Sequence, residues 1–132
     1  MQWQIRRLME RVLGSLGAIE KEVSFRSLPE GEYRIADVAF ISAARWDSAD
    51  PEGYLMGAPD LVVEVLSQAN TATEMMDKER LCLSNGSKQF WLVDMKQRLV
   101  KVTTAEGHSA IYTSGQQIPV FDNFIDVDSI FA

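Results

Sequence analysis

Hydrophobic side chains at the start of the chain recur every three or four residues over positions 3–16. The apolar positions are Ile5, Leu8, Met9, Val12, Leu13 and Leu16. This spacing predicts an amphipathic helix that ends near Gly14 and Gly17. Apolar and polar residues then alternate over 18–25, which predicts a strand. Residues 29–32 have the composition of a turn, so residues 34–41 are predicted as the antiparallel partner of that strand.

A polar stretch over 42–59 predicts one long loop, and an apolar strand follows it over 60–66. Thr71 and Glu74 have the S/T-x-x-E spacing of a capping box, which predicts the start of a second helix. That helix is expected to run to about Ser84 and to stop at Asn85 and Gly86.

The rest of the chain is rich in strand-forming residues. Residues 88–95 predict a strand, and short strands follow over 99–104, 109–113 and 116–120, while residues 126–132 predict one helical turn. The order of helix, hairpin, strand, helix, strand and antiparallel meander predicts an α/β or α+β fold, in which helices flank a mixed sheet. We expect one domain over residues 1–132.

Composition excludes several classes of protein. The 132 residues are 46% hydrophobic, which is enough for one core, and no apolar run approaches the ~18 residues of a membrane span. The N-terminus carries Glu10 among its apolar positions and lacks a cleavage site of small residues, so no secretory signal is predicted. Cys82 and His108 are the single residues of their types, which excludes an internal disulfide and sites built from several Cys or His side chains. We expect a soluble, cytoplasmic protein.

The net charge of −6 argues against a large phosphate-binding surface but not against a local one. Basic residues cluster twice along the chain, at Arg6, Arg7 and Arg11 and again at Lys96, Arg98 and Lys101. Most clusters of this size are solvated surfaces, so neither is assigned a ligand from the sequence.

Glu64 lies among leucine and valine residues in the predicted strand over 60–66. An ionised carboxylate there is costly unless something pairs with it. Asp60 points to the same face of an extended strand but lies roughly 13 Å away at ~3.3 Å per residue. Two groups so far apart cannot hold one metal ion between them. We therefore expect Asp60 to open the strand and not to be the partner of Glu64.

Asp37 is a better partner for Glu64, because it too is an acid within an apolar strand. If the two strands are neighbours, their carboxylates converge in an arrangement that suits Mg²⁺, which takes one or two carboxylates and keeps several waters. The alternative is that each acid faces solvent, and the pattern alone does not decide between the two.

Chemistry on phosphate also needs a cation nearby. Lys78 lies on or beside the apolar face of the predicted second helix, although spacing alone favours a surface pair with Glu74. Arg80 and Lys88 are alternatives with weaker placement.

Four stretches resemble the Uma-two family of restriction-endonuclease-like proteins, within the PD-(D/E)xK nuclease superfamily. They are RIADVAFISAARW, GAPDLVVEVLS, MMDKERLCLSNG and KQFWLVDMKQRLVKV, and with the final meander they cover nearly the whole chain from about residue 5. The resemblance implies a restriction-endonuclease-like fold in which Asp37 and Glu64 bind Mg²⁺, helped by the main-chain carbonyl of Val65. The lysine that normally follows the second acid by two residues is replaced by Leu66, and Lys78 is implied to take its role.

The sequence departs from the family pattern at several places. Ala36 replaces the usual proline before the first acid, no proline follows Ser67, and Cys82 stands where relatives often carry tyrosine. Relatives usually carry an extra segment before the first helix, whereas this chain begins almost at that helix. If the segment completes the substrate groove or a dimer contact, we expect the chain to fold yet to be impaired.

The leading hypothesis is an Mg²⁺-dependent endonuclease that hydrolyses DNA phosphodiester bonds, with Mn²⁺ able to replace Mg²⁺ and with Asp37, Glu64 and Lys78 as catalytic residues. A homodimer is the expected assembly, with no membrane partner. One alternative is a non-catalytic interaction or DNA-binding module, which the acidic balance and the short N-terminus favour. Another is a phosphodiesterase directed at RNA, which the sequence does not separate from the first. Four further residues are expected on the surface or at element ends rather than in the site: Glu10, Glu22, Asp94 and His108.

Overall fold

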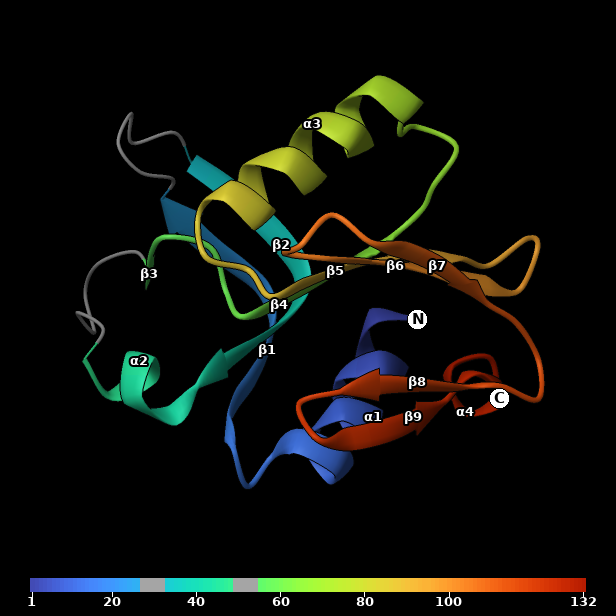
Figure 1. Cartoon of the computed structure of the whole chain (residues 1–132), viewed down its shortest axis with the longest axis horizontal. Coiled ribbons are helices and arrows are strands. Elements are labelled where there is room, and N and C mark those ends of the chain that lie inside the picture. The colour runs from blue at the N-terminus through green and yellow to red at the C-terminus, as the bar shows by residue number, and fades with distance from the viewer. Residues whose placement is uncertain (27–32, 49–54) are drawn as a thin grey trace.

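A seven-stranded mixed sheet forms the centre of the protein, with strand order β3-β1-β2-β4-β5-β6-β7 (Figure 1). The computed structural model describes residues 1–26, 33–48 and 55–132. The strands of this sheet are β1 (Gly17–Arg26), β2 (Tyr33–Ser42), β3 (Leu55–Met56), β4 (Leu61–Val65), β5 (Gln89–Asp94), β6 (Leu99–Thr104) and β7 (Ser109–Tyr112). Two neighbouring pairs, β1 with β3 and β4 with β5, are parallel, and the other pairs are antiparallel. The predicted mixed sheet is therefore confirmed.

Helices cover both faces of the sheet. One face carries α1 (Gln2–Leu13), α4 (Val127–Ile130) and a separate strand pair, β8 (Gln117–Val120) with β9 (Asn123–Asp126), while α3 (Ala72–Ser84) lies on the opposite face (Figure 1). The fourth helix, α2 (Ala43–Asp47), packs against β1 and β2. No helix within the described ranges is long and apolar enough to cross a membrane.

Each covered face has its own hydrophobic core. The core beneath α1 is built from alternate positions of β2, β4, β5 and β6, with the fully buried Trp91 among them, and α1 contributes Ile5, Leu8, Met9 and Leu13, as its spacing predicts. The core beneath α3 contains Phe90 and Cys82. Burial raises the pKa of the Cys82 thiol to about 12, so this side chain stays protonated and serves as a small apolar core residue.

The start of α3 is fixed by the predicted capping interaction. The Thr71 hydroxyl oxygen accepts a hydrogen bond from the Glu74 amide at 3.1 Å, which satisfies one of the amides left free at a helix start. The helix ends at Ser84, and Gly86 follows with a positive φ of 111°. Both ends agree with the sequence prediction.

Two predictions about connecting segments were wrong. The segment 42–59 was expected to be a loop, but it contains α2 and β3; residues 49–54, like the predicted turn over 29–32, lie outside the described residues. The second correction concerns the C-terminal meander, because β8 leaves the main sheet and pairs with β9, a strand that was not predicted. Phe121 and Asp122, which join β8 to β9, have φ of 47° and 63°, a hairpin geometry usually marked by Asn or Gly.

Asp60 is held by Arg45, the central residue of α2. Its Oδ1 accepts hydrogen bonds from Arg45 Nη1 at 3.0 Å and from the Ser42 amide at 3.1 Å. Arg45 also donates to the main-chain carbonyls of Ala58 and Met56. Asp60 therefore fixes the entry into β4 and is not a partner of Glu64, as strand geometry predicts.

Candidate active site

Asp37 and Glu64 face each other where β2 and β4 begin to separate. The antiparallel register of these strands ends at the pair Val38–Val63, and Asp37 and Glu64 occupy the next position along it. The Asp37 amide donates to Glu64 Oε2, and the Val65 amide donates to Asp37 Oδ2, each at 2.9 Å. The two carboxylates thus bind main-chain amides that the strand ladder no longer pairs. The predicted adjacency of the two strands is confirmed.

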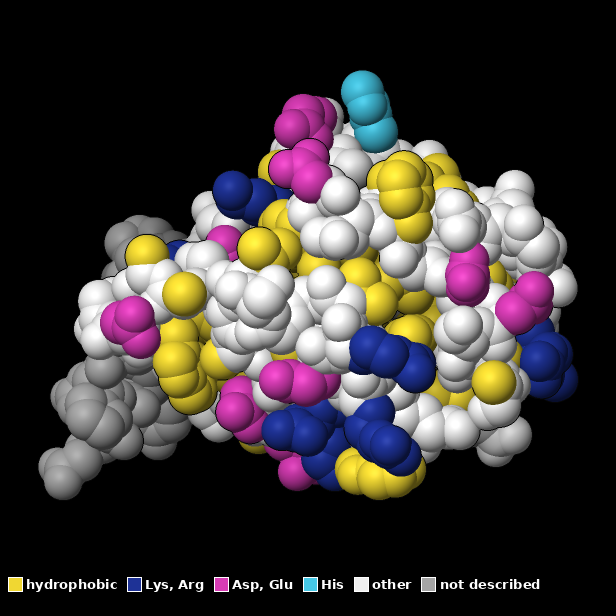
Figure 2. Space-filling model, turned by 90° about the horizontal axis from the view of Figure 1, so that it is seen from below, with side chains coloured by type: hydrophobic (Ala, Val, Ile, Leu, Met, Phe, Trp, Pro, Cys, Tyr) yellow, Lys and Arg dark blue, Asp and Glu magenta, His cyan; other side chains and the backbone are white. Residues whose placement is uncertain are grey.

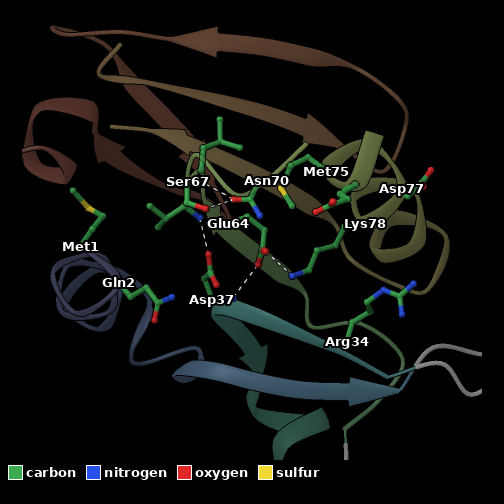
Figure 3. Close-up of a pocket in the computed structure, with 13 residues that line it drawn as sticks. Met1, Gln2, Arg34, Asp37, Glu64, Ser67, Asn70, Met75, Asp77 and Lys78 are labelled. Atoms are coloured by element: carbon green, nitrogen blue, oxygen red, sulfur yellow. Dashed lines mark hydrogen bonds and ion pairs between the residues drawn. The ribbon is translucent and has the colours of Figure 1, made fainter. Parts of the chain in front are cut away.

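Lys78 reaches this pair from α3 (Figure 3). Its Nζ lies 2.5 Å from Glu64 Oε1 and donates to the Ile35 carbonyl at the same distance. The side chains of Lys78 and Glu64 are only 15% and 5% exposed. Lys78 therefore pairs with Glu64 and not with Glu74, so the surface pair that spacing alone favours does not form.

The two carboxylates and Lys78, which we call the Asp37–Glu64–Lys78 cluster, open into a cavity of about 740 Å³. The cavity lies between α3 and the start of α1, so segments that are far apart in the sequence meet at it. Further lining residues are Met1, Gln2, Arg34, Val65, Leu66, Ser67, Asn70, Glu74, Met75 and Asp77. The residues set aside in the sequence, Glu10, Glu22, Asp94 and His108, and the alternative cations Arg80 and Lys88, do not line it.

Asn70 is a site residue that sequence reasoning missed. Its Oδ1 accepts hydrogen bonds from the Ser67 amide at 2.9 Å and from the Ser67 hydroxyl at 3.0 Å, which closes the turn after β4. The Asn70 Nδ2 group has no acceptor among the described residues, and it lies at the wall of the cavity (Figure 3). The signal in the sequence was the Ser-x-x-Asn spacing after the acidic strand, which is typical of a side-chain-closed turn.

The carboxylate of Glu64 is perturbed in the direction expected of a buried acid. Burial raises its pKa above the ordinary value of 4.5, the charge and hydrogen bond of Lys78 and the Asp37 amide oppose the rise, and the Asp37 charge adds to it. Burial is the largest of these effects, so Glu64 binds a proton more tightly in the folded protein than in the unfolded chain.

This shift predicts how Glu64 affects stability when no divalent cation is present. Because the folded-state pKa is raised, the stabilisation from Glu64 is fully present below pH 4.5 and is lost as the pH rises through the folded-state pKa. Urea unfolding in EDTA from about pH 4 to pH 8 should therefore show the free energy of unfolding of the wild type falling relative to that of Glu64→Gln. If the free energy of unfolding of the wild type stays constant or rises relative to that of Glu64→Gln across this pH range, the raised pKa assigned to Glu64 is wrong.

The donor atoms of the site fit Mg²⁺ better than a transition metal. Nowhere in the described ranges do three or more His, Cys, Asp or Glu side chains gather as metal ligands. The cavity offers two carboxylates, and Asp37 Oδ1 accepts no hydrogen bond from the described residues. Val65 adjoins both acids, and its carbonyl stays the predicted third donor. Mg²⁺ commonly takes one or two carboxylates and completes its shell with water, so the chemistry of these donors fits this ion.

The two basic groups seen in the sequence are arranged differently in space. Arg7 lies over the Trp3 ring at 4.7 Å on α1, and Figure 2 shows that this side of the molecule carries basic side chains with acidic ones beside them. The second group is divided, because Arg98 contacts Phe131 while Lys101 faces the side of α3. Neither of these two groups therefore forms a continuous basic surface.

The fold of this chain is similar to that of a solved structure. It matches a crystal structure described as a "putative nuclease belonging to DUF820" from Anabaena variabilis ATCC 29413, with a TM-score of 0.84 and 17% sequence identity. The match covers 98% of this chain and 77% of that one. A comparison with curated proteins gave no match.

The sequence itself identifies the family. Residues 3–128 match the model of the Uma2 family, whose description is "Putative restriction endonuclease". The chain belongs to the Uma2 family, which confirms the resemblance and the nuclease-like fold inferred from its motifs.

Proposed function

We propose that the protein is a metal-dependent nuclease that hydrolyses DNA phosphodiester bonds at the Asp37–Glu64–Lys78 cluster. One observation carries the proposal: three side chains from β2, β4 and α3 converge on one cavity in a member of a family whose description is "Putative restriction endonuclease". A buried acid with a raised pKa beside a specific cation in a cavity is a typical signature of a functional site.

Asp37, Glu64 and the Val65 carbonyl would hold Mg²⁺, with Mn²⁺ as a substitute. The bound cation would act as a Lewis acid, lowering the pKa of water and neutralising charge that develops on the phosphate. Glu64 would then stay ionised in spite of its burial, because a second positive charge adds to that of Lys78.

Lys78 contributes a positive charge next to the place where phosphate charge develops. Its Nζ is anchored by the Ile35 carbonyl, so it can turn from Glu64 towards a phosphate oxygen without leaving the cavity. Its Nζ can donate a hydrogen bond to the substrate. A cation placed in advance stabilises the transition state without reorganisation at the moment of reaction.

The test is cleavage of end-labelled single-stranded DNA, duplex DNA, supercoiled plasmid and RNA, each in Mg²⁺, in Mn²⁺ and in EDTA. The proposal predicts cleavage of DNA in either metal and none in EDTA. Cleavage confined to RNA would support the RNA-directed alternative. Binding of DNA without cleavage in any metal would support the non-catalytic module and contradict the proposal.

A further inference from the structure

A second, more apolar groove continues from the cavity of the proposed active site. It has a volume of about 440 Å³ and lies between the first turns of α3 and the open face of β5 and β6. Four residues line both the groove and the cavity, namely Leu66, Ser67, Asn70 and Met75. The two spaces are therefore neighbours with a common wall, which places the groove next to a ligand held at the Asp37–Glu64–Lys78 cluster.

The groove is built mainly from apolar side chains of the sheet and of α3. Leu92 on β5 lies directly opposite Lys101 on β6, and Lys101 lies opposite Ile111 on β7, so these three side chains form a row across the sheet. Met76 projects from α3 into the same groove and is 58% exposed, while Ile111 is 59% exposed. Large apolar side chains left this open beside a cavity are typical of a ligand-binding surface.

The groove also carries polar groups among its apolar side chains. Asn70 Nδ2, which has no acceptor in the described parts of the chain, lies at the common wall. Lys101 supplies one cation, half-buried among the apolar residues. The single acid of the groove, Glu79, accepts a hydrogen bond from the Thr103 hydroxyl at 2.7 Å, which holds its carboxylate against β6.

We propose that this groove binds the base of the nucleotide next to the bond that is cleaved. The base would lie against Met75, Met76 and Leu92, with Asn70 and Lys101 contacting its edge or the adjoining phosphate. Unpaired bases bind to apolar and aromatic surfaces through their faces, whereas a base stacked within a duplex is not free to enter such a groove. The proposal rests on the proposed function and makes it more specific: the preferred substrate is single-stranded or locally unpaired DNA.

The test compares two single-stranded oligomers of equal length, oligo(dT) and an abasic oligomer with the same phosphodiester backbone. Contact with one base contributes about 1–3 kcal/mol, so oligo(dT) should have a kcat/KM at least about fivefold higher and bind correspondingly tighter. Met76→Asp, which places a charge in the apolar wall, should lower the kcat/KM for oligo(dT) by about the same factor and leave the abasic oligomer unchanged. The matched control is Met95→Asp, at another exposed methionine outside the groove, which should affect neither oligomer.

Equal cleavage of the two oligomers, or equal behaviour of Met76→Asp and Met95→Asp, would overturn the proposal. Fluorescence anisotropy of the same labelled oligomers in EDTA measures their affinities without turnover. If neither oligomer is cleaved, the proposed function fails, but the affinities still test whether the groove binds a base. Tighter binding of oligo(dT) that is lost in Met76→Asp supports base binding in the groove. Equal binding of the two oligomers overturns it.

Discussion

Replacing Glu64 by glutamine is expected to lower the single-turnover rate of DNA cleavage by about a thousandfold or more. A metal ion contributes several kcal/mol to transition-state stabilisation, and each 1.36 kcal/mol corresponds to about a factor of ten in rate. Glutamine retains an oxygen that can accept the Asp37 amide, but it removes the charge that would bind the cation and pair with Lys78. The fold should survive, because the substitution is close to isosteric and Lys78 Nζ keeps the Ile35 carbonyl as a hydrogen-bond acceptor.

The matched control for this variant is Glu10→Gln, an exposed acid of α1 that lies outside the cavity lining. Its rate should stay within about threefold of the wild type, a change of less than 1 kcal/mol. Circular dichroism and thermal unfolding should show Glu64→Gln folded. If a folded Glu64→Gln cleaves DNA as fast as Glu10→Gln, the site assignment is wrong.

Replacing Lys78 by methionine is the second large effect, and it should change both activity and stability. Loss of one preorganised cation or donor typically lowers a rate by about 10²–10³-fold, which we expect for single-turnover cleavage at saturating Mg²⁺. Without Lys78 the buried Glu64 carboxylate loses its partner, and leaving one charge of a buried pair alone costs about 3 kcal/mol at a pH where Glu64 is ionised. Its pKa should rise further, because burial is then less opposed.

Urea unfolding in EDTA measures the stability effect of Lys78→Met, and the loss should be larger at pH 8 than at pH 5, since protonation of Glu64 relieves the unpaired charge. Arg80→Met and Lys88→Met are the matched controls, because these cations are exposed and lie outside the cavity. A Lys78→Met protein that matches them in rate and in stability would remove Lys78 from the proposed mechanism.

Much of the fold was predictable because its strongest patterns are local. The apolar spacing of α1 predicts the residues that α1 buries, and the capping box at Thr71 predicts the start of α3. The missed elements lack such signals. The helix α2 is five residues long, too short to show a helical period. The role of its Arg45 becomes clear only from its hydrogen bond to Asp60, which is distant in the sequence. The turn between β8 and β9 has Phe121 and Asp122 where a hairpin usually shows glycine or asparagine.

The candidate site was predictable only in part, because it depends on which strands are neighbours. An acid within an apolar strand identifies Asp37 and Glu64 one at a time, but their convergence follows from the pairing of β2 with β4, which periodicity does not determine. Spacing along α3 favours Glu74 as the partner of Lys78. The packed helix is instead rotated so that Lys78 pairs with Glu64. The role of Asn70 depends on a turn between β4 and α3, and the shared wall with the groove is visible only in three dimensions.

The most direct test of the central claim is a Mg²⁺ titration of DNA cleavage by the wild type and by Asp37→Asn, under single-turnover conditions. Asp37 is chosen because its Oδ1 accepts no hydrogen bond from any residue that the structure describes, and because its loss leaves the Glu64–Lys78 pair in place. We predict cleavage by the wild type that rises from zero with Mg²⁺ and saturates, with a rate for Asp37→Asn lower by about a thousandfold or more. Cleavage by the wild type in EDTA, or a folded Asp37→Asn that follows the wild-type titration, would contradict it.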